Sequence, residues 1–154
     1  MKRTLLSLMM ITTFLTAGVY NAETGWNYKQ TTFQCFYLFE NLTIDGNPAE
    51  AEDVIGAFTD EGVCVGWIEV DPGGFTTVPT VGDDGSAYSG GYLNPGESPT
   101  FRIFDASSGS ESTLATQDGV LPVVLAGGSF VDALQNEVDG SFTNNELFTL
   151  YGTS

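Results

Sequence analysis

The sequence contains no histidine and very few basic residues. Its 154 residues include four Lys or Arg, 20 Asp or Glu, and no His. The lack of histidine removes the commonest general base and the commonest transition-metal ligand together. Ser-His-Asp and Cys-His nucleophilic sites are therefore excluded within this sequence. A zinc site would have to combine two cysteines with carboxylates, which is an uncommon ligand set.

Long hydrophobic runs are also missing, except at the start of the chain. There, Lys2 and Arg3 precede an apolar, threonine-containing stretch over residues 5–19. This pattern predicts a secretory signal peptide over residues 1–22 and an extracellular or cell-surface location. The apolar stretch is too short for a comfortable transmembrane helix and no stop-transfer pattern follows it, so we expect no membrane span after signal removal.

Two bonds are candidates for signal cleavage. Cleavage after Ala22 would place the large Tyr20 at the −3 position, whereas cleavage after Gly18 would place Thr16 there. Small residues are preferred at such sites. With the signal peptide taken as residues 1–22, residues 23–154 are expected to form one domain of ordinary size.

Positive charge is scarce in the mature sequence. Lys29 and Arg102 are its two basic residues against all 20 acidic residues, which gives a net charge of −18 in place of −16 for the whole chain. Nucleic acids and anionic lipid headgroups require clustered Lys and Arg, so neither is an expected partner. Such a surface suits divalent cations or basic partners, and equally suits a plain solvated, salt-tolerant exterior.

Cysteine is the other scarce residue type. Cys35 and Cys64 are the two cysteines of the sequence. An even count in an exported protein suggests a disulfide, and both residues lie in strand-like runs that a bridge could join. Two buried thiols would give the same sequence, so both interpretations stay open.

The sequence does contain many short β-strand patterns. Aromatic and β-branched runs, several with period two, mark strands near residues 33–39, 42–44, 54–58, 63–70, 75–79, 100–105, 112–114, 120–125, 129–131 and 147–151. Turn residues separate these runs and no amphipathic helical window appears. The pattern predicts an all-β domain, an antiparallel β-sandwich (immunoglobulin-like or jelly-roll-like) of about 8–10 strands. We expect the strand at 147–151 to pair with an early strand.

The stretch 53–67 is predicted to form the central pair of strands of this sandwich. Two strands flank the turn at Asp60-Glu61-Gly62, and each strand contains a glycine, Gly56 or Gly66. Glycine inside a strand indicates a bulge or a close approach by another group. We expect a Trp or Phe of the facing sheet to occupy this space.

The order of motifs resembles a known module. Ile44-Asp45-Gly46 is followed by Asp53-Val-Ile-Gly-Ala-Phe58, Gly62-Val-Cys-Val-Gly66 and Pro99-Thr-Phe-Arg-Ile-Phe-Asp105-Ala106. This order resembles a β-sandwich module of large secreted, surface-associated proteins of Gram-negative bacteria, many of which carry type IX sorting signals. The resemblance covers roughly residues 26–106, about half of the chain. It implies a non-catalytic extracellular module used in adhesion, surface display or accessory binding.

Acidic turns are the candidate metal ligands. Asp83 and Asp84, in a glycine-rich loop, and Asp45, in an Asp-Gly turn, offer the hard oxygen atoms that calcium prefers. Their spacing is not that of an EF-hand, and Asp-Gly pairs are common in plain turns. Asp53 and Asp105 flank strands and are expected to accept hydrogen bonds from loop amides as Asx turns.

Aromatic residues in loops are the candidate ligand-binding groups. Tyr88 and Tyr92 lie in the glycine-rich loop and Phe75 follows Gly73-Gly74. Flat rings beside acids and amides suit glycans, whose C–H faces stack on rings while their hydroxyls bond to polar groups. The alternative is that these rings cover the sandwich core.

Two functions follow from these observations. The first is a secreted, non-catalytic module that binds an extracellular glycan or surface protein, with calcium as a possible cofactor. The second is a structural subunit that self-associates into a fibre or surface assembly by strand exchange. A two-carboxylate glycosidase would also need no histidine, but 20 acids on a small domain bring carboxylates together by chance. We therefore predict that the protein is not an enzyme.

Overall fold

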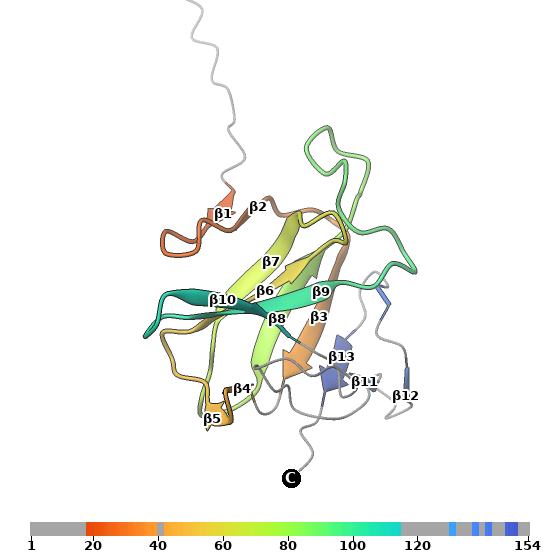
Figure 1. The fold of residues 1–154 in the computed structure, drawn as a ribbon. Coiled ribbons are helices and arrows are strands. Elements are labelled where there is room, and N and C mark those ends of the chain that lie inside the picture. The colour runs from red at the N-terminus through yellow and green to blue at the C-terminus, as the bar shows by residue number, and fades with distance from the viewer. Residues whose placement is uncertain are drawn as a thin grey trace, which may run out of the picture.

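The computed structural model describes residues 18–39, 42–114, 130–131, 137–138, 141–142 and 147–150. Short strands dominate it (Figure 1). They are β1 (Val19–Tyr20), β2 (Asn27–Tyr28), β3 (Gln34–Phe39), β4 (Thr43–Ile44), β5 (Asn47–Pro48), β6 (Val54–Phe58), β7 (Cys64–Glu69), β8 (Thr76–Val81), β9 (Thr100–Asp105), β10 (Ser110–Thr113), β11 (Phe130–Val131), β12 (Glu137–Val138) and β13 (Leu147–Leu150). Most of the predicted signal peptide (residues 1–17) and the predicted strand at 120–125 lie outside the described residues.

Two main sheets form the domain. One has the strand order β10-β9-β6-β7 and the other β12-β11-β13-β3-β8, while β1–β2 and β4–β5 form separate hairpins. Among the described strands, β13 pairs with β3 in parallel and the other ladders are antiparallel. The predicted all-β, sandwich-like fold is confirmed, and so is the pairing of the 147–151 segment with an early strand.

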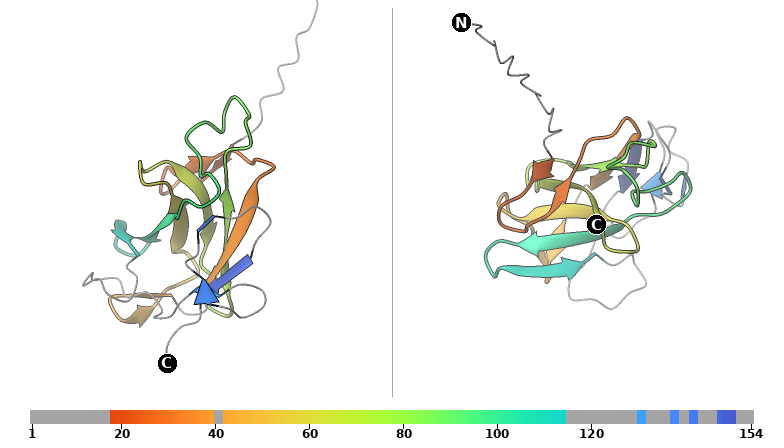
Figure 2. Two further views of the ribbon diagram at one scale, coloured as in Figure 1. Left: turned by 90° about the vertical axis from the view of Figure 1, so that its right-hand side faces the viewer. Right: turned by 90° about the horizontal axis from the view of Figure 1, so that it is seen from above.

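The two sheets pack face to face through aromatic rings. Tyr37 and Phe39 of β3 are at most 1% exposed. Their ring centroids lie 5.1 and 4.9 Å from that of Phe101 on β9, in edge-to-face arrangements. Such pairs add about 0.5–1.5 kcal/mol each beyond the area that they bury. The core therefore lies between β3 and β9, and the two main sheets are its layers (Figure 2).

Strand β6 is central to the four-stranded sheet and is buried along its whole length. Ile55 and Ala57 face the other sheet, because their neighbours on β9 are Ile103 and Phe101. Gly56 faces the opposite way, where a Cβ atom would lie 2.8 Å from the Trp26 ring. The expected bulky ring is present, but it comes from the segment before β2 and covers the outer face.

Gly66 on β7 leaves room for a different group. A Cβ atom there would overlap the Pro79 carbonyl oxygen of β8 and lie 2.8 Å from its carbonyl carbon. β7 and β8 are edge strands of different sheets, so this is where the two sheets approach most closely. The group that needs the space is backbone rather than the predicted aromatic ring. Pro79 sits on an edge strand, as its missing N–H requires.

The Asp45-Gly46 pair makes the predicted hairpin turn. Both residues have positive φ, 50° and 80°, between the paired strands β4 and β5. Positive φ at both central positions is the geometry of a type I′ turn, which Asp-Gly favours.

The two cysteines are not joined. Cys35 on β3 and Cys64 on β7 are both buried thiols, so the possible disulfide is absent from the structure. Burial raises the pKa of the Cys64 thiol, whose sulfur lies 3.6 Å from the Gly66 carbonyl oxygen. Neither thiol is therefore placed as a reactive nucleophile.

Among the described residues, no helix has the length and apolar character needed to cross a membrane.

Candidate functional site

The glycine-rich loop after β8 contains most of the predicted ligand-binding residues. The loop begins at Gly82 and returns to Leu93, and it is closed at its base by the bridge between these two residues. The Asp83 N–H donates to the Leu93 carbonyl at 2.8 Å, and the Gly82 N–H donates to the Phe33 carbonyl at 2.9 Å. The base of the loop is thus fixed to the sheet, and the loop extends from one end of the molecule (Figure 1).

Asp83 and Asp84 fix the interior of the loop. One Asp84 carboxylate oxygen accepts from the N–H and hydroxyl of Thr32 at 2.8 and 3.0 Å, and the other accepts from the Ser86 N–H at 3.0 Å. The Asp83 carboxylate accepts from the Gly85 N–H at 2.8 Å. The Ser89 hydroxyl, fully buried, lies 2.7 Å from Asp83 and 3.2 Å from Asp84. Hydrogen bonds from Ser86 and Thr32 hold the pKa of Asp84 well below its usual value.

These bonds bear on the predicted calcium site. The oxygens of Asp84 already have protein donors, whereas a calcium ligand needs its oxygens directed at the ion. Asp45 lies in the β4–β5 turn and not in this loop. No group of three or more Asp, Glu, Cys or His side chains placed to share an ion occurs in the part of the chain that the structure describes. The three predicted ligands are therefore not brought together.

Tyr92 is part of the core rather than of a binding surface. Its side chain is 8% exposed, and its hydroxyl accepts a hydrogen bond from the Lys29 backbone N–H at 2.9 Å. The structure thus removes Tyr92 from the candidate ligand-binding residues. It matches the alternative in which the ring covers the core.

Tyr88 is half-buried and held in place. Its hydroxyl donates to the Gln30 carbonyl at 3.4 Å, and the Lys29 ammonium lies 5.3 Å from the centre of its ring. This distance is within the range of a cation–π interaction. Tyr88 therefore combines a partly exposed ring with a fixed orientation.

Phe75 is 41% exposed but lies far from Tyr88. It immediately precedes β8, and the Tyr88 loop follows the other end of that strand. A six-residue strand is about 20 Å long, because each residue adds about 3.3 Å. The structure therefore does not bring Phe75 and Tyr88 into one site.

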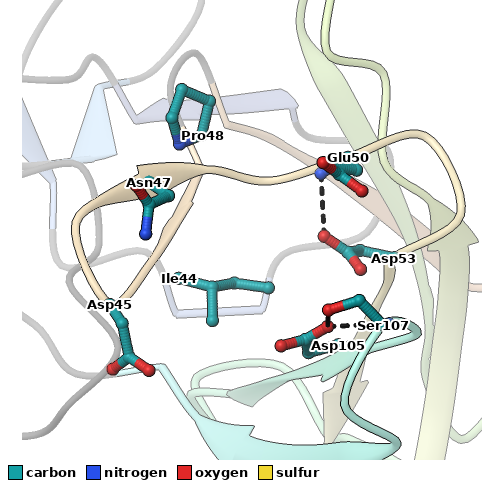
Figure 3. Close-up of a pocket in the computed structure, with 8 residues that line it drawn as sticks. All are labelled: Ile44, Asp45, Asn47, Pro48, Glu50, Asp53, Asp105 and Ser107. Atoms are coloured by element: carbon teal, nitrogen blue, oxygen red, sulfur yellow. Dashed lines mark hydrogen bonds between the residues drawn. The ribbon is translucent and has the colours of Figure 1, made fainter.

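An acidic pocket lies beside the β4–β5 hairpin (Figure 3). This hairpin is at the opposite end of the fold from the loop that follows β8 (Figure 1). The pocket has a volume of about 290 Å³, and it is lined by Ile44, Asp45, Asn47, Pro48, Glu50, Asp53, Asp105 and Ser107. Figure 3 shows Asp45 across the pocket from Asp53 and Asp105. Sequence reasoning did not identify this pocket, because its walls come from three separate turns.

The two strand-flanking aspartates of the pocket have structural partners. Asp53, 4% exposed, accepts from the Glu50 N–H at 2.8 Å and from the Ala106 N–H at 3.0 Å. Asp105 accepts from the Ser107 hydroxyl and N–H at 2.7 and 2.8 Å. Hydrogen bonds from Ser107 and Ser108 lower the pKa of Asp105. The predicted Asx turn is confirmed for Asp105, whose carboxylate accepts from the N–H two residues later. Asp53 accepts from loop amides as expected, but they belong to residues 50 and 106, so it joins two loops and does not form an Asx turn.

Arg102 belongs to a stack on the outer face of the four-stranded sheet. Its guanidinium carbon lies 4.1 Å from the centre of the Phe58 ring, and it forms an ion pair with Glu111 at 3.0 Å. The Trp26 indole N–H donates to the same Glu111 carboxylate at 3.3 Å. Of the two basic residues that follow position 22, Arg102 is thus used in packing and Lys29 lies beside the Tyr88 ring.

Comparison of the chain with known protein families, with curated proteins and with solved structures finds no match.

Proposed function

We propose that the protein is a secreted, non-catalytic module that binds an extracellular glycan at the surface formed by Tyr88 and Lys29. The observation that carries the proposal is the fixed, partly exposed Tyr88 ring. Its hydroxyl is bonded to Gln30 and its face lies near Lys29, while Asp83 and Asp84 fix the loop around it.

Preorganisation is what makes this ring suitable. When a side chain is already ordered, binding does not have to immobilise it. This saves about 0.5–1.5 kcal/mol of conformational entropy for each such side chain. The ring offers an apolar face for sugar C–H groups, and the adjacent Lys29 ammonium can donate hydrogen bonds to sugar hydroxyls. Both requirements of sugar recognition are thus met by two neighbouring side chains.

The charge of the protein indicates the class of glycan. The mature sequence carries 20 acidic against two basic residues, so a polyanionic chain would be repelled over most of the surface. Lys29 acts only locally, since screening at physiological salt limits its reach to about 8 Å. A neutral glycan therefore fits better than an acidic one.

Glycan-array screening followed by titration calorimetry of the exported protein tests this function. Tyr88→Ala should weaken binding of a neutral glycan at least tenfold, equivalent to about 1.4 kcal/mol. Tyr88→Phe keeps the ring but loses the hydrogen bond to Gln30, so it should lose some affinity, though less than Tyr88→Ala. Phe75→Ala removes an exposed ring about 20 Å away and is the matched control.

Two results would refute the binding site. One is an array on which no glycan is bound, and the other is a folded Tyr88→Ala protein with unchanged affinity. Filaments of the purified protein in electron micrographs would instead favour the alternative function, a subunit that assembles by strand exchange. In the described fold β13 already pairs with β3 of its own chain, so the binding function is the one that we propose.

A further inference from the structure

The N-terminal hairpin bears on where the signal peptide ends. The structure places β1 directly after Gly18, and β1 pairs with β2 in the register Val19–Tyr28 and Tyr20–Asn27. Residues 19–22 fall inside the signal peptide predicted from the sequence, yet here they belong to a folded element. Cleavage after Ala22 would cut this hairpin in its turn.

The turn is built around Asn21. Its side chain is 7% exposed, and its carboxamide oxygen accepts from the Glu23 N–H at 3.0 Å and from the N–H and hydroxyl of Thr24 at 2.9 and 3.0 Å. Its backbone N–H donates to the Trp26 carbonyl at 2.9 Å and its carbonyl accepts from the Gly25 N–H at 3.0 Å. Removing Asn21 would leave all of these groups without their present partner.

Both tryptophans of the chain attach the hairpin to the four-stranded sheet. Trp26 lies over Gly56 on β6, with its ring centroid 5.1 Å from that of Phe58. The indole N–H of Trp67 on β7 donates to the Val19 carbonyl at 3.1 Å. Loss of Val19 would therefore remove one of these two attachments.

We infer that the signal peptide is cleaved between Gly18 and Val19, so that the mature protein begins at β1 and keeps the whole hairpin. This bond has Gly18 at −1 and Thr16 at −3, two small residues, whereas the bond after Ala22 has Tyr20 at −3. The inference rests on the export that the proposed function requires, and it adds the position of the processing site.

N-terminal sequencing and intact mass of the exported protein test the inference, after expression of the full chain in a Gram-negative host. Two matched variants place a large residue in each competing site: Thr16→Tyr at −3 of the first bond, and Ala22→Tyr at −1 of the second. Ala22 is exposed in the turn, so its replacement leaves the hairpin intact.

The expected mature N-terminus is Val19, both in the wild type and in Ala22→Tyr, with unprocessed precursor accumulating in Thr16→Tyr. A mature N-terminus at Glu23 that is lost in Ala22→Tyr would overturn the inference and leave the secreted function standing. A wild-type chain that stays full-length inside the cell would overturn both.

Discussion

Replacement of Gly66 by alanine tests the closest approach of the two sheets. The added Cβ atom would overlap the Pro79 carbonyl oxygen and lie 2.8 Å and 3.3 Å from two further backbone atoms of β8. Backbone cannot rotate away as a flexible side chain can, so β7 and β8 must separate. Overpacking of a core costs about 1–3 kcal/mol, and we expect the upper end of this range.

The magnitude converts into a shift of the unfolding temperature. For a domain of this size, each kcal/mol lowers the midpoint by about 3–5 °C, so Gly66→Ala should unfold about 10–15 °C below the wild type. Circular dichroism during heating measures this, and urea unfolding gives the free energy. The transition should remain cooperative, because the remainder of the core is unchanged.

Gly90→Ala is the matched control. A Cβ atom added at Gly90 would have no atom within 4 Å, and the φ angle of Gly90 is not in the positive region that disfavours alanine. Its replacement should be neutral or stabilising by up to about 1 kcal/mol, through the unfolded chain. A Gly66→Ala protein that unfolds within about 2 °C of the wild type would refute the close contact between β7 and β8.

Two further substitutions test the roles of aspartates. The folded-state pKa of Asp84 is depressed, so its contribution to stability is present above its unfolded pKa, near 3.9, and is lost as the pH falls through the lower folded value. Asp84→Asn should therefore lower the urea midpoint of unfolding at pH 7. The difference in midpoint between this variant and the wild type should become smaller as the pH approaches 2. An equal difference at both pH values would contradict this expectation. Asp53→Ala leaves the Glu50 and Ala106 N–H groups without their acceptor and should cost about 1–3 kcal/mol in urea unfolding. Asp53→Asn keeps one acceptor oxygen and should cost less, so equal losses would show that these hydrogen bonds are not the cause.

The parts of the fold that depend on local chemistry could be predicted from the sequence. Alternation along residues 33–39 and 100–105 identifies the inward rings Tyr37 and Phe101, because side chains of a strand alternate between its two faces. The Asp45-Gly46 turn follows from the tolerance of these two residue types for positive φ. The fold class, the strands and the turns thus depend on the residues of short segments, and local sequence is enough to predict them.

The contacts that involve distant residues could not be predicted in the same way. Gly66 indicates that something lies close, but not that the group is the Pro79 backbone of a strand in the other sheet. Tyr92 turns inward because the Lys29 N–H bonds to its hydroxyl, and the composition of its own loop contains no sign of that partner. The sequence therefore pointed to the loop at which we propose the site, while the structure was needed to show that Tyr92 is buried and Tyr88 is partly exposed.

The parallel ladder between β3 and β13 has a consequence for how the protein folds. It pairs Phe36 with Leu147, so a strand near the beginning of the fold cannot complete its pairing until the segment near residue 150 is present. Contacts so distant in sequence must overcome a large loop-closure entropy before they contribute energy, and this slows folding. Until residues 147–150 have been synthesised, β3 keeps one hydrogen-bonding edge open and its sheet incomplete. Completion of the five-stranded sheet is therefore a late event in the folding of this chain.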